Sequence, residues 1–203
     1  MKKCAIFGAS GHGDVVSEIA KLNSFKCYLF DDNYSDSSLM KKIEGNFDNL
    51  LNAHNEFDNV IVAIGNNKIR SKFYKKLESV NAEMFPLIHP NSKISESVKL
   101  GAGTVIMPGV VINTSSKIGK SAIVNTGVIV DHDCSIGDFC HLSPGSVLAG
   151  GVNIGSKTWI GLGSKIIQNI QIGKNVVVGA GSTVINNIKD EDKVVGTPAK
   201  SLK

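Results

Sequence analysis

The sequence has few aromatic residues, few cysteines and no long hydrophobic run. Aromatic residues make up only 6% of the 203 residues, so the core must be built mainly from aliphatic side chains. The four cysteines form no CxxC pair and are too sparse for a disulfide framework, which indicates a reduced, cytoplasmic protein. A run of about 18 apolar residues is missing, which excludes a membrane-spanning helix. The basic start turns glycine-rich too early for a signal peptide.

An excess of charge of one sign is also missing. Lys and Arg number 22 against 18 Asp and Glu, which gives a net charge of +4. Because these charges are scattered along the chain, they do not predict a nucleic-acid-binding surface. The 42% hydrophobic and 20% charged residues are typical of a globular protein.

The charged residues divide the chain into two parts. Residues 1–90 contain 11 basic and 11 acidic residues, whereas the slightly longer segment 91–187 contains 7 and 4. The change follows two prolines, Pro86 and Pro90, which bracket a short apolar run. We therefore expect one domain over residues 1–88 and a second over residues 89–203.

The second part contains an internal repeat of six residues. Starting at Ile94, every sixth residue as far as Val184 is Ile, Leu or Val, and the residue two positions earlier is small or β-branched. This period fits neither an α-helix nor a single strand, but it fits a short strand and a corner, three of which form a triangular coil. Such coils stack about 4.8 Å apart and bury their apolar faces against one another. The repeat predicts a β-helix, with Cys134 and Cys140 at inward-facing small positions.

The N-terminal part alternates between apolar segments and helical patterns. Strands are expected at residues 4–7, 27–30 and 60–64, and helices at about residues 14–22 and 69–77. This βαβ alternation predicts a small parallel sheet that binds ligands at the carboxyl ends of its strands.

A glycine turn, Gly8-Ala9-Ser10-Gly11-His12-Gly13, follows the first expected strand. Its GxxGxG spacing differs from the GxGxxG dinucleotide motif, but backbone amides at a helix N-terminus still favour a phosphate. Asp31 follows about 20 residues later, where a carboxylate can accept a hydrogen bond from a ribose hydroxyl. The alternative is a plain glycine turn near solvated acids. A domain of roughly 90 residues suits a nucleotide-sugar better than a complete dinucleotide.

Three of the four acidic residues of the repeat lie beside two histidines in residues 131–141. A neutral imidazole is suited to act as a general base, and an adjacent carboxylate can fix its tautomer and raise its basicity. His132 with Asp133, or with Asp131, meets this requirement. The alternatives are a solvated histidine and a metal site. His132 and His141 form a poor metal-binding set, because zinc takes three or four ligands.

The whole chain resembles the hexapeptide-repeat acyltransferases, and within them the sugar O- and N-acetyltransferases of the NeuD/PglD type. Besides the repeat, the glycine turn and the His132 segment, the resemblance is carried by Asp31-Asp32, Ile64-Gly65-Asn66-Asn67-Lys68-Ile69-Arg70, Leu87-Ile88-His89-Pro90 and Val195-Gly196-Thr197-Pro198-Ala199-Lys200.

The resemblance implies a Rossmann-like domain followed by a left-handed parallel β-helix, and a homotrimer that binds acetyl-CoA between neighbouring β-helices. The family's general base matches His132, and its partner carboxylate matches Asp133, where PglD-like members carry Glu. The implied acetyl-CoA contacts are His141, Leu162 and Ala180, and the implied nucleotide-sugar contacts are Ser10, Gly11, His12, Asp31, Asp32 and Gly65. No metal is expected.

These expectations together indicate an acetyl-CoA-dependent N-acetyltransferase. Its substrate would be the amino group of a nucleotide-linked amino sugar, such as a UDP-4-amino-4,6-dideoxy sugar used in glycan biosynthesis. Three other functions stay open at this point: a sugar O-acetyltransferase of the sialic-acid type, a metal-dependent β-helix hydratase, and a non-catalytic sugar-nucleotide binder.

Overall fold

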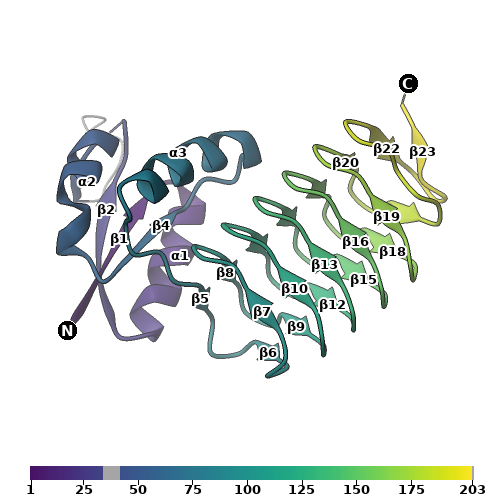
Figure 1. Cartoon of the computed structure of the whole chain (residues 1–203), viewed down its shortest axis with the longest axis horizontal. Coiled ribbons are helices and arrows are strands. Elements are labelled where there is room, and N and C mark those ends of the chain that lie inside the picture. Colours follow the sequence, from purple (N-terminus) through teal and green to yellow (C-terminus); the bar gives the residue numbers. More distant parts are fainter. Residues whose placement is uncertain (34–41, 203) are drawn as a thin grey trace.

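The computed structural model describes residues 1–33 and 42–202, which form a small α/β domain and a long β-helix (Figure 1). The α/β domain has a four-stranded parallel sheet in the order β3-β2-β1-β4. Its elements are β1 (Lys2–Phe7), α1 (Gly11–Leu22), β2 (Phe25–Phe30), β3 (Ile43–Gly45), α2 (Phe47–Ala53), the 3-10 helix η1 (His54–Glu56), β4 (Asn59–Val62) and α3 (Asn67–Ser79).

Apolar side chains cover both faces of this small sheet. On one face, Cys4 and Ile6 pack with Val16 and Ile19 of α1. On the other face, Phe7 and further aromatic residues pack with α2 and α3. Both clusters continue into the β-helix, the first through Val105 and Ile123 and the second through Phe139.

The two principal helices differ from the expected ones only at their ends. Helix α1 begins at Gly11 rather than near Asp14. The N–H groups of the first helical turn have no intrahelical acceptors, so glycine is tolerated in this turn. Helix α3 extends from Asn67 to Ser79, and the Asn66 side chain caps it by accepting from Lys68 N and Ile69 N.

The rest of the chain is a β-helix with three parallel faces, as the six-residue period predicts. The five-stranded face contains β7 (Lys99–Leu100), β10 (Lys117–Ile118), β13 (Ser135–Ile136), β16 (Asn153–Ile154) and β19 (Gln171–Ile172). The six-stranded face contains β6 (Lys93–Ile94), β9 (Val111–Ile112), β12 (Ile129–Val130), β15 (Val147–Leu148), β18 (Lys165–Ile166) and β21 (Thr183–Val184). The eight-stranded face contains β5 (Leu87–Ile88), β8 (Val105–Ile106), β11 (Ile123–Val124), β14 (His141–Leu142), β17 (Trp159–Ile160), β20 (Val177–Val178), β22 (Lys193–Val195) and β23 (Lys200–Ser201).

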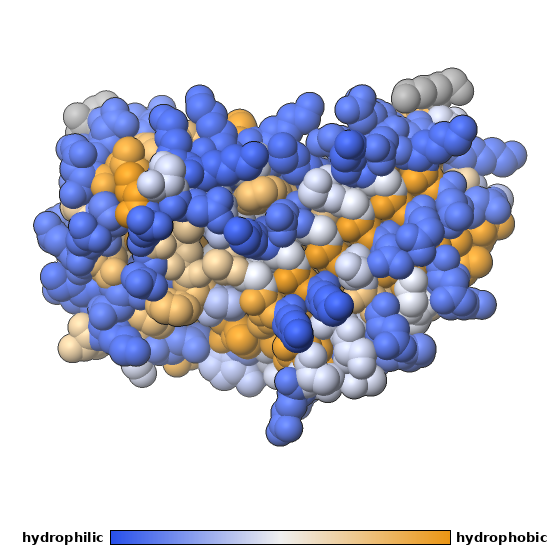
Figure 2. All heavy atoms as spheres, in the orientation of Figure 1, coloured by the Kyte–Doolittle hydropathy of each residue, from blue (hydrophilic) through white to orange (hydrophobic). Residues whose placement is uncertain are grey.

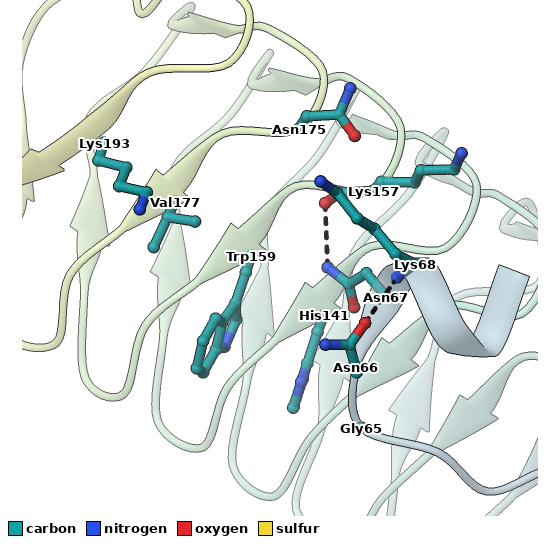
Figure 3. Close-up of a pocket in the computed structure, with 10 residues that line it drawn as sticks. All are labelled: Gly65, Asn66, Asn67, Lys68, His141, Lys157, Trp159, Asn175, Val177 and Lys193. Atoms are coloured by element: carbon teal, nitrogen blue, oxygen red, sulfur yellow. Dashed lines mark hydrogen bonds between the residues drawn. The ribbon is translucent and has the colours of Figure 1, made fainter.

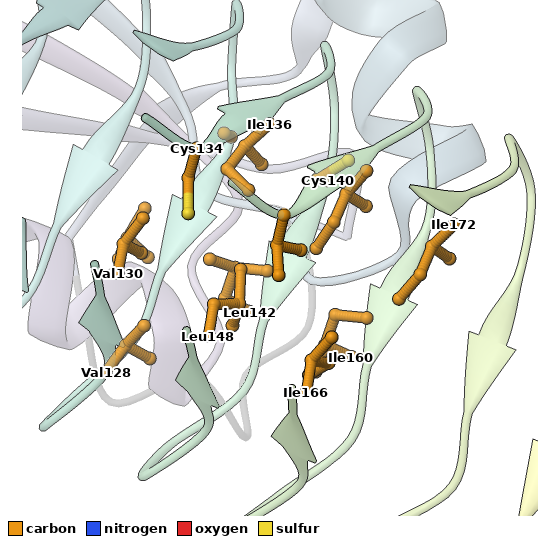
Figure 4. Packing of buried hydrophobic residues seen from close by; sticks show 14 of the residues in the cluster. Val128, Val130, Cys134, Ile136, Cys140, Leu142, Leu148, Ile160, Ile166 and Ile172 are labelled. Atoms are coloured by element: carbon orange, nitrogen blue, oxygen red, sulfur yellow. The ribbon is translucent and has the colours of Figure 1, made fainter. Parts of the chain in front are cut away.

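The interior of the β-helix is lined by the aliphatic column that the repeat predicts. From Ile106 to Val184 every member of this column is buried, while Ile94 and Leu100 at the first coil are half-buried. Figure 4 shows members of the column meeting at the centre of the prism. In the view of Figure 2, a band of hydrophobic residues runs along the β-helix between rows of hydrophilic ones.

The small inward positions also satisfy buried backbone carbonyls. Thr104 Oγ1 donates to Gly119 O at 2.7 Å, and Thr158 Oγ1 donates to Gly173 O at 2.7 Å. Cys140 Sγ lies 3.1 Å from Gly155 O in the same relation. Each acceptor lies 15 residues further along, at a corner of the next coil, which explains why Ser, Thr and Cys occupy these positions. The packing role expected for Cys140 and Cys134 is therefore supported, since both are 1% exposed.

The outward-facing positions give each face a different character. On the five-stranded face they are mostly polar: Lys99, Lys117, Ser135, Asn153 and Gln171. On the six-stranded face they include the apolar Val111, Ile129 and Val147. On the eight-stranded face they run from Val105 and Ile123 under the α/β domain to His141, Trp159 and Val177.

The first β-helix strand lies slightly ahead of the expected domain boundary. Leu87 and Ile88 pair in parallel with Val105 and Ile106, so residues 87–88 already belong to the eight-stranded face. The domain boundary expected between residues 88 and 89 stays a prediction, and it lies within two residues of the point where the β-helix begins. Within the described residues, no helix is both long and apolar enough to cross a membrane.

Candidate active site

The glycine turn and the ends of β2 and β4 surround a cavity of about 250 Å³. Ser10, Asp31, Asp32 and Gly65 line it, so the structure brings together four of the residues expected to bind a nucleotide-sugar. Gly11 and His12 follow directly as the first residues of α1. We call this space the glycine-turn cavity.

Both aspartates at this cavity also hold the backbone in place. Asp31 accepts hydrogen bonds from Ala9 N at 2.8 Å and from Asn33 N at 2.9 Å. Asp32 accepts from Phe47 N at 3.0 Å, at the start of α2. Asp31 therefore shapes the glycine turn itself, a role that the sequence analysis did not assign to it.

His12 is half-buried at the start of α1 and does not line the glycine-turn cavity. Its Nε2 atom has no hydrogen-bond partner among the described residues. Burial, together with the positive charge of Arg70, lowers the pKa of His12 to about 4. The imidazole is therefore neutral near pH 7.

A second cavity of about 610 Å³ lies where the eight-stranded face emerges from beneath α3 (Figure 3). His141, Trp159 and Val177 form one side, on three successive coils. Three lysines add positive charge around it. The lining also includes Gly65, Asn66, Asn67, Lys68, Lys157, Asn175 and Lys193. We call this space the lysine-rich cavity, and it shares Gly65 with the glycine-turn cavity.

His141 is held in a neutral form at the inner end of the lysine-rich cavity. Its ring lies parallel to that of Trp159, with the two centroids 6.1 Å apart. The Nε2 atom lies 3.1 Å from Asn125 Nδ2, so it accepts when the proton is on Nδ1. Burial and the nearby Arg70 lower the pKa of His141 to about 4. A backbone hydrogen bond with Gly65 also engages the ring, so His141 is an uncharged, hydrogen-bonded part of the cavity wall.

Leu162 and Ala180 lie at one corner of the β-helix, two residues after β17 and β20 respectively. Gly181 N donates to Leu162 O at 2.7 Å, which stacks the two corners directly. Leu162 is 58% exposed. The two residues border neither cavity directly, but they lie on the same coils as Trp159 and Val177. Their role in binding acetyl-CoA stays a prediction.

His132 and Asp133 form a close pair at the corner between β12 and β13. His132 Nδ1 lies 2.8 Å from Asp133 Oδ2, and both side chains are more than half exposed. Asp131 accepts from Asn113 Nδ2 at 2.8 Å and from His132 N, so it orders the same corner. The bond to Asp133, assisted by the charge of Asp131, raises the pKa of His132.

The imidazole of His132 lies over Gly150 on the next coil. A Cβ atom at Gly150 would come within 2.6 Å of the ring, so glycine there makes room for the histidine. This corner is distant in the fold from both cavities, because it joins the six-stranded face to the five-stranded face. Within one chain, the structure therefore does not bring His132 to His141.

Several residues of the cavities were not predicted from the sequence. The chain has one tryptophan, Trp159, which lies 18 residues after His141 and is paired with it across one coil. That spacing was a usable signal for a shared ligand surface. Lys68, Lys157 and Lys193 come from three separate segments, α3, the corner before β17 and β22, and carried no pattern of their own. The described residues contain no group of three or more His, Cys, Asp or Glu side chains arranged to hold a metal ion.

Comparison with known proteins gives consistent results. A family model described as the PglD N-terminal domain matches residues 3–77. A curated UDP-N-acetylbacillosamine N-acetyltransferase from Bacillus subtilis is 35% identical over 116 residues, which cover 52% of this chain. The match spans 51% of that relative, about half of its length.

Solved structures match over the full chain. A variant perosamine N-acetyltransferase from Caulobacter crescentus, in complex with CoA and GDP-perosamine, is 35% identical over 100% of this chain and 98% of its own, with a TM-score of 0.95. The acetyltransferase domain of PglB from Neisseria gonorrhoeae, in complex with acetyl coenzyme A, is 36% identical over 99% of both chains, with a TM-score of 0.94. These matches confirm the expected fold class, an α/β domain followed by a left-handed β-helix.

Proposed function

The chain belongs to the PglD-like sugar acetyltransferases, and we propose that it transfers an acetyl group from acetyl-CoA to the amino group of a nucleotide-linked sugar. The observation that carries the proposal is the meeting of two unlike cavities at Gly65. One lies on a helix N-terminal glycine turn suited to phosphates. The other combines lysines with an exposed aromatic ring.

The lysine-rich cavity is suited to coenzyme A in our proposal. Lys68, Lys157 and Lys193 offer positive charge to its phosphates, while Trp159 and Val177 offer apolar surface to its pantetheine arm. His141 stays neutral and adds an uncharged ring beside this arm. The glycine-turn cavity then receives the nucleotide, so that the sugar extends past Gly65.

His132 is the general base in the proposed reaction. With Nδ1–H donating to Asp133, the Nε2 atom is left to accept a proton from the amine. The amine nitrogen attacks the thioester carbonyl, His132 takes the proton, and the C–S bond breaks to release the CoA thiolate. Asp133 stabilises the imidazolium, which then returns the proton to the sulfur.

We further propose a homotrimer, because His132 and the cavities lie on different parts of the β-helix. The six-stranded face exposes Ile129 (40%) and the neighbouring corner exposes Leu162 (58%), which is apolar surface suited to a second copy. Packing this face against another copy would bring His132 of one subunit towards the cavities of another. Acetyl-CoA would then bind between neighbouring β-helices.

The test is release of the CoA thiol with a panel of nucleotide-linked amino sugars. We expect turnover with an amino sugar on UDP or GDP, and none with the matching sugar that carries a hydroxyl in place of the amine. Turnover with the hydroxyl sugar alone would instead identify an O-acetyltransferase. Nucleotide-sugar binding without thiol release would identify a non-catalytic binder.

The glycine turn provides a matched pair of variants for the nucleotide site. A Cβ at Gly11 would have nothing within 4 Å, so Gly11→Val should fold but crowd the phosphates. We expect the KM for the nucleotide-sugar to rise by about tenfold or more, equivalent to ~1.4 kcal/mol of lost binding, with the KM for acetyl-CoA unchanged.

Gly13→Ala is the structural counterpart. A Cβ at Gly13 would clash with the carbonyl oxygen of Gly8, so this variant should lower the melting temperature. Steady-state kinetics and thermal melts of both variants separate the two effects. A parallel rise of both KM values in Gly11→Val would contradict the division of binding between the two cavities.

A further inference from the structure

Arg70 is a fully buried cation at the junction of the two domains. It lies on α3, is 1% exposed and donates only to neutral oxygens. Nε donates to Ser121 O, Nη1 to Ile64 O and Gly65 O, and Nη2 to Asn67 Oδ1, Phe139 O and Cys140 O, all at 2.8–3.1 Å. Burying a charge is costly unless all its donors are satisfied, and here the planar fork reaches three separate backbone segments.

These bonds connect the residue shared by the two cavities to the strand that carries His141. Gly65 lines both the glycine-turn cavity and the lysine-rich cavity. Cys140, whose carbonyl accepts from Nη2 at 3.1 Å, immediately precedes His141. One guanidinium therefore sets the separation between the Gly65 loop and this strand.

Asn67 extends the same connection by one coil. Its Oδ1 accepts from Arg70, and its Nδ2 donates to Thr158 O at 3.2 Å. The same Nδ2 donates to Lys157 O at 3.0 Å (Figure 3). Thr158 immediately precedes Trp159. The two strands that present His141 and Trp159 are thus both tied to the start of α3.

We propose that Arg70 and Asn67 are a positioning pair for the transfer reaction: they hold the Gly65 loop against the strands of His141 and Trp159, and thereby fix the distance between the two substrates. The inference rests on the proposed function, because it assigns the two cavities to the two substrates. Transfer between two bound molecules is sensitive to such a distance, since a shift of about 1 Å can cost about 100-fold in rate.

The charge of Arg70 supports the same role. It contributes to the lowered pKa of His12 on α1 and of His141 on β14. His12 also lowers the pKa of His141, whereas a backbone hydrogen bond with Gly65 raises it. Both imidazoles thus stay neutral near pH 7.

The test compares Arg70→Lys and Asn67→Ala with Lys120→Met. Arg70→Lys keeps the charge but loses the fork, and Asn67→Ala loses the connection to β17. Lys120→Met removes the exposed 2.7 Å ion pair to Glu78, which joins the same helix α3 to the β-helix away from both cavities. We expect kcat to fall about 10- to 100-fold in Arg70→Lys and Asn67→Ala, with the KM for each substrate within about threefold. Lys120→Met should keep the kcat of the unaltered protein.

Fluorescence of Trp159 provides a readout that does not depend on activity. Because the chain has one tryptophan, acrylamide quenching reports directly on the lysine-rich cavity. Quenching should increase in Asn67→Ala and Arg70→Lys but not in Lys120→Met. Unchanged kcat and quenching in Asn67→Ala would overturn the proposal, as would a loss of kcat that Lys120→Met shares. If Arg70→Lys does not fold, Asn67→Ala alone decides. If the unaltered protein lacks transferase activity, the proposed function fails, and the quenching comparison still tests the positioning pair.

Discussion

Replacing His132 by alanine is expected to lower kcat by about 10²- to 10⁴-fold, the range typical of a positioned general base. The side chain is 55% exposed and outside the inward-facing column, so the melting temperature should hardly change. Asp133→Asn should cost less, because it keeps the shape of the corner and removes only the charge that stabilises the imidazolium. The measurement is kcat at saturating concentrations of both substrates, with thermal melts of each variant.

The pH dependence of the rate provides an independent check on His132. A base must be neutral to accept a proton, and the bond to Asp133 raises the pKa of His132 above its ordinary value of about 6.5. The rate should therefore climb as the pH rises through that raised pKa, and the climb should move to lower pH in Asp133→Asn. It should vanish in His132→Ala. An unchanged kcat in His132→Ala would remove the residue from the mechanism and leave an already neutral amine as the nucleophile.

Ile129→Lys is expected to lower kcat strongly by separating the subunits. Ile129 is 40% exposed in the middle of the six-stranded face, and a lysine there would place like charges together in the proposed trimer. Light scattering should give about three times 21.6 kDa for the unaltered protein and a smaller mass for the variant. We expect the loss of kcat to reach about 100-fold, because each site would lose its general base.

The matched control for the subunit contact is Gln171→Lys, which adds the same charge to the polar five-stranded face. It should keep both the mass and the activity of the unaltered protein. Binding of the nucleotide (UDP or GDP), measured by calorimetry, should persist in Ile129→Lys, since the glycine-turn cavity lies within one chain. A monomeric Ile129→Lys that keeps full activity would refute a site shared between subunits.

The β-helix could be predicted in detail because its information is local. Each six-residue unit contains its own strand, corner and inward-facing residue. Every sixth residue from Ile106 to Val184 is buried, as the period requires. The elements between β2 and β4 could not be predicted from the sequence. Helix α2 has seven residues, and only Phe47 and Leu50 of it are buried, which is too few to show a helical period. The reciprocal bonds between Asn46 and Asn49 that cap it became visible only in the structure.

The parts of the candidate site formed by residues adjacent in sequence could be predicted. The parts formed by segments distant in sequence could not. The His132–Asp133 pair and the glycine turn are contiguous in sequence, so their chemistry could be inferred directly, although their roles stay predictions. Arg70 gave no such signal, because its acceptors lie 51 to 70 residues further along the chain as well as beside it. Apart from Asn67, every one of those acceptors is a backbone carbonyl. Because every residue has a backbone carbonyl, the residue types at these positions do not reveal the bonds.

The stacking of equal coils also determines where this molecule can change its length. Residues 18 apart lie directly above one another, so one added coil displaces everything beyond it by about 4.8 Å along the axis. A coil inserted between β8 and β14 would carry His141 away from the Gly65 loop and dismantle the junction with the α/β domain. A coil inserted after β20 would leave that junction intact and move only the Lys193 side of the lysine-rich cavity. The coils up to β14 therefore have a fixed number, whereas the number of coils after β20 can change without disturbing the junction with the α/β domain.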